Sequence, residues 1–199
     1  MNVSEIPMDM LSFSGHKIYG PKGIGGLYIR KGIRLEKFMH GGAHEQNRRA
    51  GTENIPGIIG FAKAIELCEK EMANDQANIG NLRDALLNKL HQQIPQIFLN
   101  GHPEKRLYNN LNLSFAGVEG ESLLLSLDLK GVAASSGSAC TSGAVDPSHV
   151  LRAMNVRPEL AQSSIRFTLG RANSMEDIDY VCEILPSIVG RLRAMSPLV

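Results

Sequence analysis

The sequence predicts an α/β protein, and three observations support this fold class. A pair of short strand-like segments surrounds a glycine-rich loop, a long helical stretch follows, and strands then alternate with helices to the end of the chain. On this basis we divide the chain into residues 1–54, residues 55–94 and residues 95–199. Because there is no internal repeat or low-complexity linker, the helical stretch is the only candidate connection between domains.

The first region is predicted to be a strand, a loop and a strand. MDMLSFS (8–14) and GGLYIR (25–30) are short apolar segments, and the glycine-rich turn KIYGPKGIG lies between them. Two or three strands with such a loop cannot bury both of their faces unaided. We therefore expect the first 50 residues to belong to a larger unit.

A helical pattern covers the second region. Apolar residues recur at helical spacing from Ile55 to about Ile94, and Pro56 suits a position in the first turn. The polar stretch near Asn74 and Asp75 is a candidate break. The sequence leaves open whether this region is one helix or two.

The third region alternates between the two kinds of element. Its predicted strands are IFLN (97–100), LNLSF (111–115) and IRFTLG (165–170). Its predicted helices are EGESLLLSLDLKG (119–131), PSHVLRAM (147–154) and SMEDIDYVCEILPSIVGRLRAM (174–195). This alternation predicts a small α/β domain.

Composition restricts the classes of partner. With 43% hydrophobic and 21% charged residues the chain can form a globular core, and its net charge of +1 provides no basic field for a nucleic-acid backbone. No apolar run is long enough to cross a bilayer, and the first residues lack the features of a signal peptide. We expect small-molecule or protein partners and a cytoplasmic location.

The three cysteines lie in different surroundings, and none is spaced for a zinc site or a disulfide framework. Cys68 and Cys182 fall on apolar helical stripes and are expected in the core. Cys140, in SSGSACTSG, has no apolar face around it and is expected in a flexible loop, where it is either a nucleophile or an ordinary loop residue. His40 and His44 are four residues apart with two glycines between them, so we expect no metal site there.

Lys17 and Arg166 are the candidate functional cations. Lys17 enters the glycine-rich loop after Ser14 and His16, in surroundings that suit a Schiff-base lysine; the alternative is a surface lysine in a turn. No Walker pattern is present, which argues against a nucleotide loop. Arg166 lies inside a strand-like stretch, where its planar fork suits a carboxylate. The alternative for Arg166 is a structural ion pair.

Four motifs together point to one family. SFSGHKIYGPKGIGGLYIR, RRAGTEN, SSGSACTSG followed by DPSHVLRAM, and SSIRFTLGR resemble the C-terminal part of the cysteine desulfurases of the nitrogen-fixation and iron–sulfur-assembly type, within the class-V aminotransferases. Tyr108 departs from this pattern, since proline is usual there. The resemblance implies a fold-type I pyridoxal-phosphate-dependent transferase. Residues 1–54 would then be the end of its large domain, and residues 95–199 its small α/β domain with the cysteine loop.

The resemblance also implies roles around pyridoxal 5'-phosphate. Lys17 would bind the cofactor covalently, while Ser14 and His16 would hold its phosphate. Thr52 would reach the partner's cofactor phosphate across a homodimer; by spacing alone it could instead cap the helix that starts near Ile55. Only 16 residues precede Lys17, so other cofactor-binding groups of the family are expected outside this sequence.

The remaining implied roles concern substrate and product. Arg166 would grip the α-carboxylate of L-cysteine, and Cys140 would take its sulfur as a persulfide, leaving L-alanine. The sulfur would pass to an iron–sulfur scaffold or another acceptor protein. No resident metal is expected, although Cys140 would be a transient iron–sulfur ligand shared with a scaffold. Two alternatives stay open: a noncatalytic domain that binds sulfur-transfer partners, and a relative similar to selenocysteine lyases.

Overall fold

The computed structural model describes residues 2–136 and 148–196, which form two compact units, Met1–Met72 and Ala73–Val199. The boundary lies inside one long helix, α2 (Ile55–Gln93). The polar stretch at Asn74 and Asp75 does not interrupt this helix, and the Asp75 carboxylate is paired with Arg171. The expected alternative of two helices is therefore wrong. No helix in the described ranges is long and apolar enough to span a membrane.

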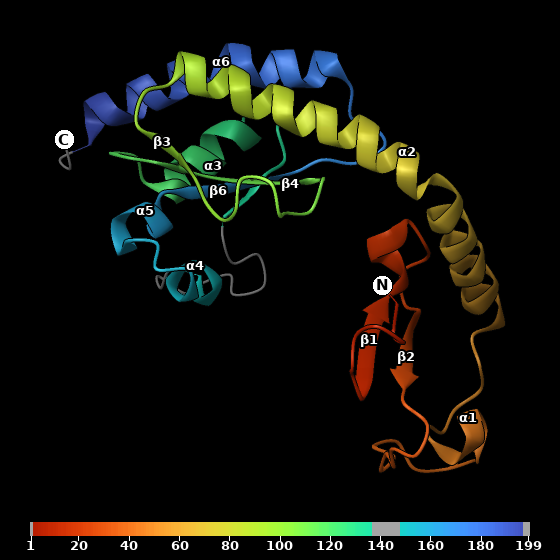
Figure 1. The fold of residues 1–199 in the computed structure, drawn as a ribbon. Helices are drawn as coiled ribbons and strands as arrows, with labels where there is room; N and C mark the ends of the chain where they lie inside the picture. The colour runs from red at the N-terminus through yellow and green to blue at the C-terminus, as the bar shows by residue number, and fades with distance from the viewer. Residues whose placement is uncertain (1, 137–147, 197–199) are drawn as a thin grey trace. The chain divides into compact units, whose positions relative to one another are not determined.

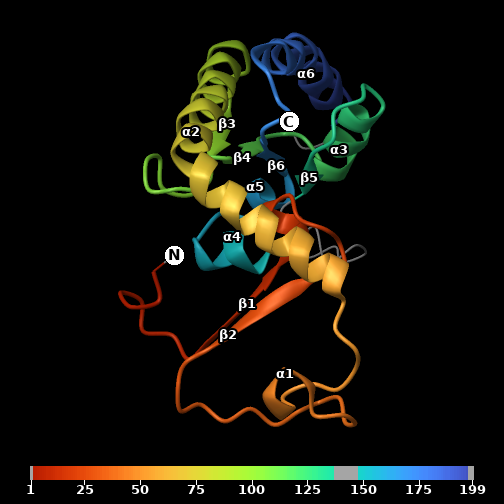
Figure 2. The ribbon, with the colours of Figure 1, turned by 90° about the vertical axis from the view of Figure 1, so that its right-hand side faces the viewer.

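The first unit contains a two-stranded antiparallel sheet (Figure 2). Its strands are β1 (Met10–Ser14) and β2 (Gly25–Ile29), with the 3₁₀ turn η1 (Gly15–Ile18) between them and the short helix α1 (His44–Asn47) after them. Both strands occur where the sequence predicted them. The 3₁₀ form of the turn and the helix α1 were not predicted, and α1 is irregular, with three of its four residues at positive φ.

Phe13 connects this sheet to α2. Its ring lies over Gly26 of β2, where an added Cβ would stand 2.6 Å from a ring carbon. The ring centroids of Phe13 and Phe61 are 5.7 Å apart, so Phe13 also packs against the first half of α2. Because Gly26 has no side chain, the Phe13 ring can lie over the neighbouring strand β2.

The second unit is a four-stranded antiparallel sheet of order β3-β4-β6-β5 with helices on both faces (Figures 1 and 2). Its elements after α2 are β3 (Ile97–Leu99), β4 (Asn110–Phe115), α3 (Gly120–Asp128), β5 (Ser135–Ser136), α4 (His149–Ala153), α5 (Pro158–Gln162), β6 (Ser164–Thr168) and α6 (Met175–Met195). The α/β fold class and the predicted strands and helices of this region are confirmed. The short elements β5 and α5 were not predicted.

The two faces of this sheet differ in character. Alternate residues of β4 and β6, including Leu113, Ile165 and Phe167, are buried against α3, α6 and the second half of α2. Asn112 and Arg166 alternate with them and therefore point to the opposite face, on the side of α4 and α5 (Figure 1). The hydrophobic core and the polar face of the sheet are thus set by the same alternation.

Candidate active site

Lys17 is carried by a turn that begins where β1 ends. The Gly15 N–H donates to the Ile24 carbonyl and the Gly20 N–H donates to the Gly15 carbonyl, both at 2.9 Å. Tyr19 closes the turn with φ of 63°, in the left-handed region. These backbone bonds hold the turn in place, while the side chains of His16 and Lys17 are exposed.

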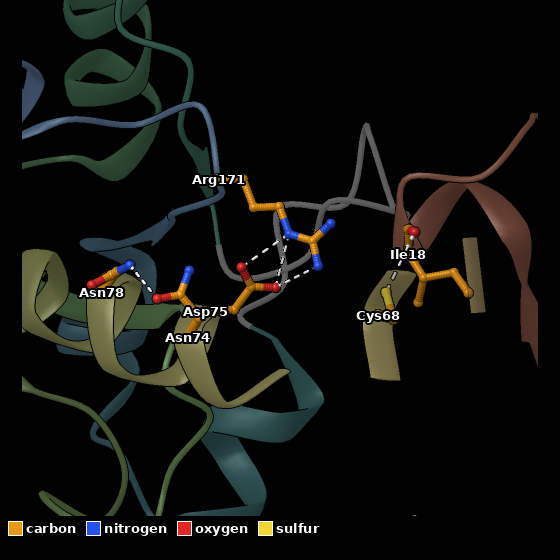
Figure 3. Close-up of polar contacts among 6 residues, drawn as sticks. All are labelled: Ile18, Cys68, Asn74, Asp75, Asn78 and Arg171. Carbon is orange, nitrogen blue, oxygen red and sulfur yellow. Dashed lines mark hydrogen bonds and ion pairs between the residues drawn. The ribbon is translucent and has the colours of Figure 1, made fainter. Parts of the chain in front are cut away.

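Cys68 lies behind this turn. Figure 3 shows its thiol directed from α2 at the carbonyl of Ile18, with 3.6 Å between Sγ and the oxygen. Cys68 is half-buried, so its expected place in the core is wrong, whereas Cys182 is buried as expected. The contact was missed because an apolar stripe on a helix does not reveal which polar group it will face.

Ser14, His16 and Lys17 share this turn, and their polar groups are available to a ligand. The Ser14 hydroxyl makes no capping bond to η1. Neither His16 nor Lys17 forms an ion pair with any residue that the structure describes. A hydroxyl, an imidazole and an ammonium within four residues are a suitable set for a phosphate and a reactive carbonyl. The turn therefore fits pyridoxal phosphate.

Thr52 lies in the exposed segment that precedes α2. It does not cap that helix, because the Asn54 side-chain oxygen accepts from the Gly57 N–H at 3.1 Å instead. Asn54 was missed as a cap although asparagine directly before a helix is a recognisable signal. The alternative expected for Thr52 is thereby removed, and its hydroxyl stays a candidate ligand. Nearby, His44 Nδ1 lies 3.1 Å from a carboxylate oxygen of Glu53.

Arg166 belongs to the other unit, in the central part of the sheet. Its position in β6 pairs with Asn112 of β4 on one side and with Ser135 of β5 on the other. Its Nε is buried and has no hydrogen-bond partner, and it forms no ion pair within the described residues. The structural ion pair considered for Arg166 is therefore not found there. A partly buried guanidinium without a counter-ion is suited to an anionic ligand.

Cys140 lies outside the described residues, so the structure does not address its predicted role. The two residues of β5 come directly before the undescribed stretch. In the sheet, Ser135 pairs with Arg166 and Ser136 pairs with Ile165. Ser136, the last residue described before that stretch, thus lies in the sheet one position beyond the pair of Ser135 and Arg166.

Comparison with known proteins identifies the family. The aminotransferase class-V family matches residues 1–181. The chain belongs to the class-V aminotransferase family. Members of this family use pyridoxal phosphate, in agreement with the set of groups on the Lys17 turn.

Individual relatives agree with this membership. The chain is 52% identical over 197 residues to cysteine desulfurase IscS of Dictyoglomus turgidum, covering 99% of this chain and 50% of that protein. It is 52% identical over 198 residues to the IscS protein of Methanosarcina thermophila, covering 100% and 49%. Among solved structures, a NifS-like protein from Rickettsia africae matches with a TM-score of 0.85 and 29% identity over 96% of this chain and 50% of that one. The chain spans about half the length of the relatives that it matches.

Proposed function

We propose that this chain forms part of a pyridoxal-phosphate-dependent cysteine desulfurase that converts L-cysteine to L-alanine and passes the sulfur to an acceptor protein, such as an iron–sulfur scaffold. The observation that carries the proposal is the Lys17 turn, which presents an amine and an imidazole that form no ion pair with the described residues, and a hydroxyl that makes no capping bond. The chain is also 52% identical to proteins named cysteine desulfurase. The protein would act in the cytoplasm as a homodimer.

Lys17, Ser14, His16 and Thr52 would hold the cofactor. The Lys17 amine binds its carbonyl carbon, and the other three side chains bind its phosphate, Thr52 from the partner subunit. When bound, the cofactor supplies an electron sink for the substrate's α-carbon. The Lys17 amine would move the proton at that carbon, a role that suits an amine on a turn held by backbone bonds.

Cys140 and Arg166 would act on the substrate. Arg166 holds the α-carboxylate with the guanidinium that lacks a partner in the sheet. The Cys140 thiolate attacks the substrate sulfur, a sulfur–sulfur bond forms, and the carbon–sulfur bond breaks. A proton takes the place of sulfur on the β-carbon, so the products are alanine and a persulfide on Cys140.

The exposed apolar residues of the first unit support a larger assembly. Met10 and Leu27, which lie on the same face of its sheet, are 46% and 48% exposed. A two-stranded sheet with an open apolar face is marginal in water. We propose that residues 1–54 are the end of a large domain whose remaining strands cover this face, and that residues 95–199 form the small domain.

The test mixes the purified protein with pyridoxal phosphate and L-cysteine, and follows cofactor absorbance together with alanine and sulfide release. Lys17→Ala is expected to abolish the absorbance change and both products. Cys140→Ser should keep the absorbance change and lose sulfide. Lys22→Ala is the matched control, because Lys22 is an exposed lysine of the same loop and should behave as the parent protein. Equal behaviour of Lys17→Ala and Lys22→Ala, in a preparation whose parent protein is active, would exclude the proposed role of Lys17.

A second mixture tests completeness. Here the same reaction is repeated with the half of a curated relative that this chain does not match. Alanine release that appears only in the mixture would show that both halves are needed. Release from neither preparation would contradict the proposed activity.

A further inference from the structure

A cavity of about 330 Å³ opens on the polar face of the four-stranded sheet. Its walls are Asn100, Gly101, His102, Lys105, Arg106, Asn110, Asn112, Ser148, Val150, Leu151, Met154 and Arg166. These described residues include three cationic side chains and no carboxylate. A cavity of this size exceeds what one carboxylate at Arg166 would fill.

The neutral polar groups of the cavity present donors. Asn100 Nδ2 donates to Asn112 Oδ1 at 2.6 Å and to Ser114 Oγ at 2.8 Å, which leaves the Asn112 amide nitrogen as a donor. His102 Nδ1 accepts from the backbone N–H groups of Glu104 and Lys105 at 3.0 and 2.9 Å. Its hydrogen is therefore on Nε2, so His102 is a donor as well.

Arg106 also lines the cavity. Its Nε donates to the His102 carbonyl at 2.9 Å and its Nη2 donates to the Asn100 carbonyl, while Nη1 is buried without a partner. Burial lowers the pKa of this guanidinium, and the nearby charge of Arg83 lowers it further. An anion beside Arg106 would offset both effects.

The strand order sets the distance between Arg166 and Asn100, whose carbonyl accepts a hydrogen bond from Arg106. The Asn100 N–H donates to the Asn112 carbonyl, and Asn112 pairs with Arg166, so Asn100 and Arg166 are two strands apart. Neighbouring strands are about 4.8 Å apart, which puts about 10 Å between these backbones. Long side chains directed into one cavity from such positions can hold two groups of one small ligand.

We propose that the cavity has a second anion subsite, formed by Arg106 with Lys105 and His102, for a small ligand whose other anionic group is held by Arg166. The ligand class is a dicarboxylate or an amino acid with an acidic side chain; a free oxyanion would satisfy the same chemistry. This inference rests on the proposed function only for the group at Arg166.

The experiment titrates the full chain by NMR with glutarate, with pentanoate and with sulfate. Glutarate carries two carboxylates and pentanoate one, on chains of equal length. Glutarate should bind about tenfold more tightly, as expected for one added charge-assisted contact. Arg106→Gln should abolish this advantage and leave pentanoate affinity unchanged. Lys130→Gln, which removes an exposed cation outside the cavity, is the matched control and should change nothing.

Comparing the three ligands shows whether the second anion is part of the ligand held by Arg166 or a separate oxyanion. Sulfate binding that survives Arg166→Gln and disappears in Arg106→Gln assigns the subsite to a separate oxyanion. Affinities for glutarate and sulfate that do not depend on Arg106 overturn the proposal. Because Arg106 also holds two backbone carbonyls, Lys105→Gln provides a second variant, with the thermal unfolding midpoint as the folding check. Pentanoate binding that is unaffected by Arg166→Gln would contradict the proposed carboxylate role of Arg166 alone.

Discussion

Arg171 grips Asp75 with two nitrogens of its guanidinium. Its Nε lies 2.9 and 2.8 Å from the two carboxylate oxygens, and its Nη2 lies 2.7 Å from one of them (Figure 3). The Asp75 side chain is 11% exposed and that of Arg171 29%. The pair joins the middle of α2 to the segment after β6, so it fixes the end of the strand that carries Arg166.

Asp75→Ala should lower the free energy of unfolding by about 2 kcal/mol, because it leaves a partly buried guanidinium without its carboxylate. Urea unfolding followed by circular dichroism measures the change. Glu66→Ala removes one partner of an exposed pair with Lys63 on the same helix, and should have an effect below about 0.5 kcal/mol. Equal losses in the two variants would show that the Asp75 pair contributes no more than a surface pair.

Leu127→Ala should destabilise the protein by about 2–5 kcal/mol, since Leu127 has no exposed surface and its truncation leaves a cavity in the core. Leu125→Ala makes the same chemical change on the same helix, where the side chain is 60% exposed. Its effect should stay within about 0.5 kcal/mol. Equilibrium unfolding in urea gives both values, and a loss at position 125 as large as at 127 would contradict the packing described for α3.

Asn54→Ala should destabilise the start of α2 by about 1 kcal/mol, because the Gly57 N–H loses its acceptor. Thr52→Ala should leave stability unchanged, since Thr52 takes no part in the cap. Thermal unfolding of both variants tests the assignment. A larger effect at Thr52 would return it to a structural role and weaken its proposed contact with a phosphate.

Cys182 should resist alkylation until the protein unfolds. Burial raises the pKa of its thiol above the usual value of 9.0, so little thiolate is present at neutral pH. The folded state keeps this proton at pH values where the unfolded chain has lost it. The contribution to stability is therefore constant below 9.0 and falls as the pH rises beyond it.

Iodoacetamide labelling mapped by mass spectrometry measures this protection. Cys68 is half-buried and provides the internal comparison, because it should be labelled faster in the folded protein. Labelling of Cys182 in the folded state at the rate of Cys68 would contradict the burial described for α6.

Most regular elements could be predicted because their local signals are strong. The alternation in β4 and β6 and the helical spacing in α6 are properties of neighbouring residues, so the chain shows them without its fold. The two residues of β5 carry no such signal and become a strand only by pairing with β6. Likewise, Asp75 looked like a helix break because its partner Arg171 lies 96 residues away.

The candidate site divides in the same way. Ser14, His16 and Lys17 are adjacent in the chain, so their common turn follows from the sequence, and so does the resemblance that assigns their roles. The place of Arg166 in a strand marked it as a candidate, but the sequence could not show that its buried Nε has no hydrogen-bond partner. The three members of the proposed subsite, His102, Lys105 and Arg106, lie within five residues of one another, but the sequence does not show that they line the same cavity as Arg166.

By itself the sequence determined the fold class, the family and the identity of the candidate lysine and cysteine, since each depends on residue types at short spacing. Only the tertiary structure decided which polar groups find partners: Arg171 with Asp75, Cys68 with Ile18, and Arg166 with no described group. The physical reason is that burial and hydrogen bonding depend on residues brought together from distant parts of the chain.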